Sequence, residues 1–443
     1  MTVQTKRNIY GEGIWVGAGQ ILSALGTLVG LRLLTSLLSP NVFGEVVLLT
    51  GIVLLANGLA ASPLMQGVLR FYPETVKANQ VSALRAVATR FLTRSTLLMI
   101  AFCLIGFAIC SSWVPVSLWL GPLIVLLLII EVGRQLELTM LNAARCQRET
   151  ALWIVLDAWS RPAVAWLMIT LMGATAVATI AGYVVASGLL LVWLKSWRRV
   201  DHGFNKVEPS STPGDSRLSL SAAGLSTSLM RYSLPLLPLG LIGWLTGQAD
   251  RYLIGGMVGV KDAGLYAALY GIVSRPFLMA GGILETWIRP IYYEAVAAQE
   301  AEQEKKVLYR WIGAVISAAV IGTGVFMLLH REIAMLFLAE SYRANASLMP
   351  WIASGYGLLM VAQVYGRVCY AHHDTKAVLL SETVGCAVAL FTTVYAVSRF
   401  GLAGAAYAVP VYFSAQLAFA IFLAHRAEGR RTVTELASGH SNA

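Results

Sequence analysis

The chain has 443 residues, of which 57% are hydrophobic and only 13% are charged, and its mean hydropathy is +0.68. Soluble globular domains average about 25% charged residues, so this composition excludes an ordinary soluble domain and indicates a membrane protein. The net charge of +10 would suggest a nucleic-acid ligand in a soluble chain. In a membrane chain such a charge sets orientation instead, and we expect no nucleic-acid partner.

Apolar runs long enough to cross the hydrocarbon core, about 20 residues each, form two sets of six. The first set lies near 11–38, 43–66, 88–110, 114–140, 150–172 and 174–195, and the second near 230–249, 263–288, 308–329, 347–369, 377–398 and 402–424. A long polar connection containing Pro209, Pro213 and Gly214 separates the two sets, which is typical of a linker. The sequence therefore predicts four parts: a six-helix bundle at 1–196, a cytoplasmic linker at 197–229, a second bundle at 230–425 and a cytoplasmic tail at 426–443.

Twelve spans put both termini on one side of the membrane, and the basic residues indicate which side. By our assignment, 23 of the 33 Lys and Arg residues lie on the terminus side. Five, including Arg251, lie on the opposite side, and the rest fall within the spans. Because basic residues concentrate in cytoplasmic loops, we expect cytoplasmic termini. The short external connections leave no room for an extramembrane catalytic domain.

Two segments of the chain, 44–74 and 264–294, read as copies of one another. The matching positions are Gly44 and Gly264, Gly51-Ile52-Val53 and Gly271-Ile272-Val273, Ala60 and Ala280, Tyr72 and Tyr292, and Glu74 and Glu294. Two similar halves in so apolar a chain are typical of secondary transporters, which place their substrate site between internal repeats. The even number of spans in each half predicts a parallel repeat.

Three stretches carry a more specific resemblance: LRLLTSLLSPNVFGEVVLL (31–49), GQADRYLIGGMVGVKDAGLYAALYGIV (247–273) and GLAGAAYAVP (401–410). With these, the whole chain resembles the Wzx-type polysaccharide-export flippases of the multidrug/oligosaccharidyl-lipid/polysaccharide (MOP) superfamily. One departure concerns an arginine that many relatives carry four residues before the proline of the first motif. Here that position is Ser36, and the nearest arginine, Arg32, lies one turn earlier.

The resemblance implies an all-α integral membrane protein with twelve transmembrane helices in two pseudo-symmetric six-helix bundles around a central cavity. It also implies the activity, which is to flip an undecaprenyl-pyrophosphate-linked oligosaccharide across the bacterial inner membrane without breaking a bond. The expected partners are the lipid-linked oligosaccharide, the bilayer, and a polysaccharide polymerase with its export machinery. No Walker loop or Rossmann glycine run is present, so we expect no cofactor and no catalytic residues.

Charges inside spans mark candidate sites, because each is costly there unless it meets a partner or water. Arg275 lies within a stripe of small or flexible side chains and has no acidic residue one helical turn away. Two roles for Arg275 follow. Either it is a cation that binds a phosphate or an acidic sugar, or the glycines serve helix packing and Arg275 pairs with an acidic residue on another helix. The stripe consists of Gly264, Ala268, Gly271, Met279 and Gly282.

Arg367 shares a helical face with Tyr356, Gln363 and Tyr370. Aromatic rings stack on sugars and the polar groups reach sugar hydroxyls, so this stripe is a candidate substrate surface. An aromatic belt at the membrane interface explains Arg367 and Tyr370 equally well.

Intramembrane carboxylates are candidates for ion coupling, and they are Glu131, Asp157 and Glu382. The alternative for the first two is neutralisation along their own helices. Arg134 stands three residues from both Glu131 and Glu137, and Asp157 stands four from Arg161.

Two further features favour a structural explanation. Arg32 is near enough to the outer end of its helix to snorkel, and His372-His373-Asp374 is interpreted as a solvated turn, so we expect no metal site. Two other functions stay open: a cation-coupled drug exporter of the same superfamily, in which acidic residues would dominate the cavity, and a membrane glycosyltransferase or polysaccharide polymerase.

Overall fold

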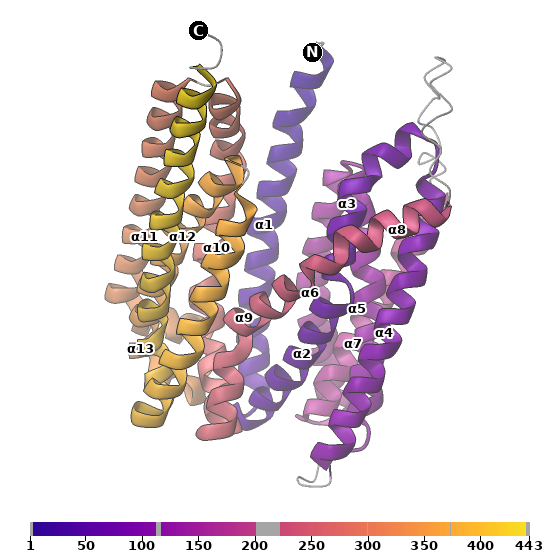
Figure 1. Ribbon diagram of the computed structural model, residues 1–443. Helices are drawn as coiled ribbons and strands as arrows, with labels where there is room; N and C mark the ends of the chain where they lie inside the picture. The colour runs from indigo at the N-terminus through magenta and orange to yellow at the C-terminus, as the bar shows by residue number, and fades with distance from the viewer. Residues whose placement is uncertain (1–2, 112–116, 201–221, 299, 373, 440–443) are drawn as a thin grey trace. The chain divides into compact units, whose positions relative to one another are not determined.

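The computed structural model describes residues 3–111, 117–200, 222–298, 300–372 and 374–439 (Figure 1). At the helix ends 3–14, 106–111, 197–200, 222–223, 375 and 427–439 it describes the backbone alone. These ranges are helical throughout except for short connections, and no strand occurs in them. The predicted fold class, an all-α integral membrane protein, is confirmed.

The helices follow one another with short connections. In the first half of the chain they are α1 (Val3–Leu37), α2 (Pro40–Ala60), α3 (Ser62–Lys77), α4 (Val81–Ser111), α5 (Leu120–Ala143), α6 (Gln147–Met172) and α7 (Ala176–Val200). In the second half they are α8 (Ala222–Ser233), η3 (Leu234–Leu236), α9 (Leu237–Met257), α10 (Val260–Ala297), α11 (Ala301–Phe337), η4 (Glu340–Leu348), α12 (Met349–Ala371) and α13 (Thr375–Gly439).

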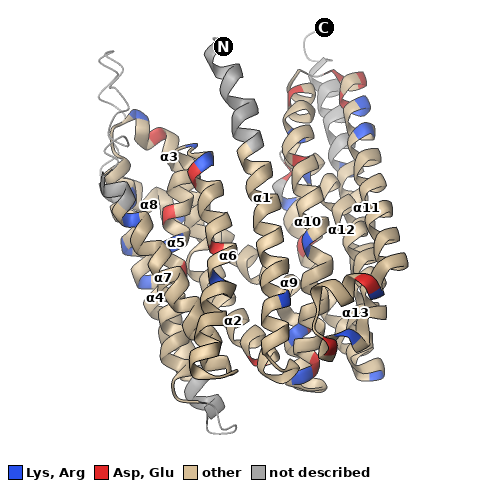
Figure 2. Ribbon diagram, turned by 180° about the vertical axis from the view of Figure 1, so that it is seen from behind, with Lys and Arg blue, Asp and Glu red and all other residues tan. Residues whose placement is uncertain are grey.

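The twelve predicted spans all have counterparts among the described helices. Nine candidates are long and apolar enough to cross a membrane. One of these, α13, contains two spans, because Gly401 with a φ of 58° breaks its helical geometry. The other two are α5 and α9, of 24 and 21 residues. α5 carries Glu131, Arg134 and Glu137 in its middle and second half, and α9 carries Asp250 and Arg251. Charged residues occur on other helices as well (Figure 2).

Two of the predicted spans run across a break between helices. The span expected at 43–66 is α2, which ends at Ala60, and its last residues belong to α3, which begins at Ser62 with Pro63 in its first turn. The span expected at 230–249 begins instead at Leu237, after the short 3-10 turn η3 with its Pro235. Proline lacks the backbone N–H that would continue a preceding helix, so both breaks have a local cause.

The chain forms two compact units whose boundaries differ from the predicted halves. One unit comprises 1–37 and 48–244, and the other comprises 38–47 and 245–443. The boundaries therefore fall inside α2 and α9, so each of these helices contributes residues to both units. Of the predicted linker, 201–221 lies outside the described residues, while 222–229 belongs to α8. Hydropathy locates spans but carries no information about which unit a span packs in.

The matching glycines of the sequence repeat meet in the structure. A Cβ atom at Gly264 would lie 2.2 Å from the carbonyl oxygen of Pro40 and 2.7 Å from the nitrogen of Gly44. A Cβ atom at Gly44 would fall within 2.0 Å of the carbonyl oxygen of Val260. Helices in membranes associate through such small-residue contacts, which let two backbones approach closely. Within the second unit, α2 and α10 can therefore pack this closely only because glycine stands at both positions.

The first unit contains similar contacts. A Cβ atom at Gly240 of α9 would lie 2.7 Å from the carbonyl oxygen of Gly58 in α2. Nearby, Nε1 of Trp244 donates a hydrogen bond of 2.8 Å to the carbonyl oxygen of Gly51. A tight glycine contact thus fixes α2 against α9 in one unit and against α10 in the other.

The contact at Gly264 predicts a sharp difference between two glycine substitutions. Gly264→Ala should lower the free energy of unfolding by about 1–3 kcal/mol, because the added methyl group meets backbone atoms that cannot move aside. Gly313→Ala in α11, where a Cβ atom meets nothing within 4 Å, serves as the control and should be neutral or stabilising, since alanine is the better helix former. Thermal unfolding of the purified protein measures both. Equal melting temperatures for the two variants would contradict the close approach.

Candidate functional site

In the first unit, four charged side chains of α5 and α6 form one closed network, here called the charge ring: Glu131, Arg134, Asp157 and Arg161. Arg134 pairs with Glu131 at 2.6 Å and with Asp157 at 3.6 Å. Arg161 pairs with Asp157 at 2.9 Å and with the second oxygen of Glu131. Each charge therefore has two opposite neighbours, and the ring has no net charge.

The charge ring extends the pairing expected from the sequence in two ways. The predicted neutralisation within α5 occurs for Arg134 and Glu131, but Glu137 pairs with Arg85 of α4 instead. The contact between Arg161 and Glu131 joins residues 30 apart in the sequence, which spacing along one helix cannot show. Two of the three candidates for ion coupling, Glu131 and Asp157, are thus each paired with two arginines.

The charge ring makes a prediction that differs from that for an isolated ion pair. If Asp157 and Arg161 were isolated, the exchange Asp157→Arg with Arg161→Asp would preserve their attraction. In the ring, this double variant puts a cation beside Arg134 and an anion beside Glu131, so it should fold no better than either single variant. Reversing all four charges restores the alternation and should recover folded protein. The yield of monodisperse protein on size exclusion is the measurement, and full yield from the double variant would contradict the ring.

In the second unit, a buried group of one cation and four tyrosines, here called the tyrosine cluster, brings together α9, α10, α12 and α13. Arg251 is only 8% exposed, and its guanidinium carbon lies 4.5 Å from the ring centroid of Tyr270. The rings of Tyr270 and Tyr356 are 5.4 Å apart, and those of Tyr266 and Tyr270 are 5.5 Å apart. Tyr412 completes the cluster through its hydroxyl contact with Tyr270.

The guanidinium of Arg251 finds its hydrogen-bond and ion-pair partners within its own helix. Its Nη1 donates hydrogen bonds to the carbonyl oxygen of Gly247 at 2.5 Å and to Oε1 of Gln248 at 2.8 Å, and it lies 3.4 Å from Oδ1 of Asp250. The assignment of Arg251 to an external connection is therefore wrong. It lies inside α9 and is buried, because Asp250, the tyrosines and the backbone carbonyl replace the solvent that a loop would give it.

Arg275 lies at the edge of the tyrosine cluster. Its electrostatic neighbours are Tyr356 and Arg251, and its side chain is exposed. Among the described residues it forms no ion pair, so the acidic partner that the packing alternative required is absent there. The small residues of its stripe do not all support the same role. Gly264 packs against Pro40, as the helix-packing explanation requires, whereas Gly271 and Gly282 are only half-buried, which agrees with an exposed cation.

The predicted stripe on α12 does not form one surface. Tyr356 is buried in the tyrosine cluster, whereas Arg367 pairs with Glu285 of α10 at 2.9 Å and lies 5.6 Å from the ring centroid of Tyr370. Gln363 lies between these two positions, beside Gly281. Arg367 thus has the acidic partner that Arg275 lacks. Spacing along α12 shows which residues share its face, but not that Glu285 approaches from α10.

Glu382, the third coupling candidate, is half-buried on α13. Its carboxylate bonds to the side chain of Gln416 in the second segment of the same helix and lies near Arg367. Within the described residues Glu382 forms no ion pair at 4.0 Å or less, which distinguishes it from Glu131 and Asp157. The structure therefore brings Glu382 and Arg367 into one neighbourhood, separate from the charge ring.

The polar turn after α12 is not fully solvated. Nε2 of His372 lies 3.2 Å from Oε1 of Glu304, and the His372 side chain is only 6% exposed, so the expectation of a solvated turn is wrong for this residue. His373 lies outside the described residues. Three-residue groups of metal-binding side chains do not occur in the described part of the chain.

Sequence reasoning missed Tyr266, Tyr270 and Tyr412, and used Asp250 and Arg251 only as part of the stretch 247–273 that carries the family resemblance. A signal existed for two of the tyrosines: Tyr266 and Tyr270 are four residues apart, which puts both on one face of the helix that follows the one with Arg251. No comparable signal links them to Tyr412, which lies more than a hundred residues away.

No protein-family model matches this sequence, and neither does any of the curated proteins. Solved structures do match over nearly the whole chain. An inward-facing multidrug resistance MATE family transporter of the MOP superfamily has a TM-score of 0.65 at 14% identity, covering 99% of this chain and 97% of its own. The lipid II flippase MurJ in an inward closed conformation has a TM-score of 0.67 at 11% identity, covering 96% and 93%.

A third similar structure is a MOP superfamily transporter from Pyrococcus furiosus, described as having a binding pocket of reverse polarity that suggests a different function. It has a TM-score of 0.62 at 13% identity and covers 96% of both chains. Identities this low show the fold alone. The chain has the fold of the MOP superfamily transporters, a multi-pass membrane fold, and these neighbours are transporters and a flippase rather than enzymes.

Proposed function

We propose that this protein flips an undecaprenyl-pyrophosphate-linked oligosaccharide across the bacterial inner membrane by alternating access, with both termini in the cytoplasm. The proposal rests on the transporter fold, which it shares with a lipid II flippase, on the resemblance of its motifs to polysaccharide-export flippases, and on the chemistry of the second unit. The flipped glycan would then be a substrate for a polysaccharide polymerase and its export machinery.

Arg275 is the observation that carries this proposal. It is a cation within α10, exposed and without an ion pair among the described residues, and the buried Arg251 lies near it. Two positive charges close together repel one another, so an anion at Arg275 would relieve that repulsion as well as neutralise the side chain. A pyrophosphate or an acidic sugar supplies such an anion, and a guanidinium can bind either through two parallel hydrogen bonds.

Tyr356, a neighbour of Arg275, and aromatic and amide groups further along α12 suit the sugar part of the same substrate. Tyr356 belongs to the tyrosine cluster, while Gln363, Tyr370 and Arg367 follow along α12. The Gln363 side chain makes no hydrogen bond within the described residues and is available to sugar hydroxyls. Arg367 already pairs with Glu285. It would therefore hold neighbouring side chains in place rather than bind the anion of the substrate.

The drug-exporter alternative requires free acidic residues to bind a cationic compound and a coupling ion. Glu131 and Asp157 are each held by two arginines, which leaves Glu382 as our candidate for ion coupling. Glu382 and Arg275, the candidates that form no ion pair among the described residues, fit an ion-driven transporter of an anionic substrate. A glycosyltransferase or polymerase is less consistent with this fold, whose neighbours are transporters.

The role of Arg275 is tested in proteoliposomes loaded with a fluorescent undecaprenyl-pyrophosphate oligosaccharide. Arg275→Ala should lower the flipping rate by at least about tenfold, since a hydrogen bond to a charged group contributes roughly 1.5–3 kcal/mol. Arg275→Lys should recover part of the rate by keeping the charge without the two-pronged geometry.

Arg331→Ala, which removes an exposed cation from α11, is the matched control and should transport normally. Normal flipping by Arg275→Ala, or loss of its folded protein, would contradict the proposed role. In the same vesicles, Glu382→Gln should abolish the dependence of flipping on an imposed ion gradient, and a persisting dependence would exclude Glu382 as the coupling group.

A further inference from the structure

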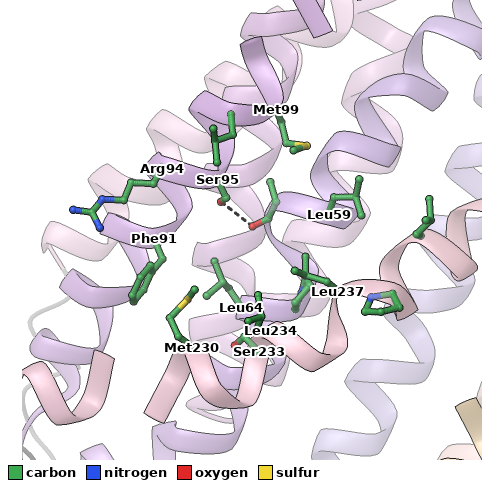
Figure 3. Close-up of a pocket in the computed structure, with 15 residues that line it drawn as sticks. Leu59, Leu64, Phe91, Arg94, Ser95, Met99, Met230, Ser233, Leu234 and Leu237 are labelled. Carbon is green, nitrogen blue, oxygen red and sulfur yellow. Dashed lines mark hydrogen bonds between the residues drawn. The ribbon is translucent and has the colours of Figure 1, made fainter. Parts of the chain in front are cut away.

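The first unit contains an apolar groove of about 740 Å³ between α4 on one side and α8, η3 and α9 on the other, with the junction of α2 and α3 as its floor (Figure 3). Its floor is buried, with Leu64 at 7% and Ala60 at 2% exposure. Its walls are open, with Leu98 at 68% and Leu234 at 57%. Because these wall side chains are exposed and apolar, and Leu98 lies on the spanning helix α4, the groove is accessible to a hydrocarbon chain from the bilayer.

A cation stands at the edge of this apolar groove. Arg94 contributes to its lining, and Figure 3 shows its guanidinium pointing outward from the groove wall. Arg90 lies one turn earlier on α4, and Arg231 follows Met230, another lining residue, on α8. None of these three exposed arginines forms an ion pair within the described part of the chain. The groove therefore combines an apolar interior with an unneutralised positive rim.

A polar atom in the groove also lacks a partner. The Ser233 side chain lines it and is 2% exposed, and its Oγ forms no hydrogen bond with the residues described. The other serine of the groove, Ser95, is satisfied by the carbonyl oxygen of Ala60 at 3.0 Å. A buried hydroxyl without a partner is costly, and an ester or glycerol oxygen of a lipid would satisfy Ser233.

We infer that this groove is a binding site for an anionic phospholipid, with one acyl chain along Leu64 and Leu98 and the phosphate near Arg94. Basic pockets between spanning helices bind anionic headgroups, and Arg94, the arginine that lines the groove, gives it this character. A zwitterionic lipid could fill the apolar part equally well but would gain less from the cations. The site is separate from Arg275 and the tyrosine cluster, which belong to the other unit, so it goes beyond the proposed transport function.

Native mass spectrometry of the full-length protein, incubated with phosphatidylglycerol or with phosphatidylcholine of the same chains, tests the inference. The wild type should retain phosphatidylglycerol about fivefold more tightly than phosphatidylcholine, as expected for one arginine near a phosphate. Arg94→Gln should remove this preference while leaving retention of phosphatidylcholine unchanged. Leu98→Trp, which narrows the groove, should reduce retention of both lipids.

Each variant has a neighbouring control on α4. Arg90→Gln removes a cation one turn from Arg94, and Leu97→Trp adds the same bulk beside Leu98; neither residue lines the groove. Both controls should behave like the wild type. Equal effects of Arg90→Gln and Arg94→Gln, no preference in the wild type, or full competition by inorganic phosphate would overturn the lipid site. Because no transport is measured, these outcomes are independent of the proposed function.

Discussion

The free-energy cost of a charge in hydrocarbon organises this structure. Such a charge persists only when a partner, a water-filled space or an aromatic face compensates it. In the first unit the charges where α5 and α6 meet are fully compensated, since four of them neutralise one another in a closed ring. In the second unit Arg251 is enclosed by tyrosines and backbone, and Arg367 has Glu285. Arg275 departs from this pattern, and for that reason it is the residue on which a function can be proposed.

Close helix packing supplies the second constraint. Glycines at equivalent positions of the sequence repeat, Gly44 and Gly264, let the backbones of α2 and α10 touch, and Gly58 with Gly240 does the same for α2 and α9. Both α2 and α9 contribute residues to each unit. Close glycine contacts therefore recur along the same helix α2, with α10 in one unit and with α9 in the other.

Much of the fold can be predicted from the sequence, because the length of an apolar run and the spacing of helix-breaking residues are local properties. The spans follow from hydropathy, and the twelve-helix architecture follows from their number. Contacts between helices are not local, and there the sequence was insufficient. Spacing along α12 grouped Tyr356 with Arg367, but Glu285, which neutralises Arg367, is 82 residues away. Arg251 was assigned to an external connection because the apolar run was taken to end at residue 249, whereas α9 continues to Met257. His372 was expected in solvent because nothing along its own helix shows its partner Glu304, which lies on α11.

The central claim is that the substrate is a lipid-linked, anionic oligosaccharide, and its most direct test is mass spectrometry of the membrane lipids of a strain lacking this gene. The account predicts that an undecaprenyl-pyrophosphate-linked oligosaccharide accumulates in the deletion strain, and that the wild-type gene removes it whereas a gene encoding Arg275→Ala does not. An unchanged lipid-linked pool, together with increased sensitivity of the deletion strain to cationic drugs, would contradict the claim and favour a drug exporter.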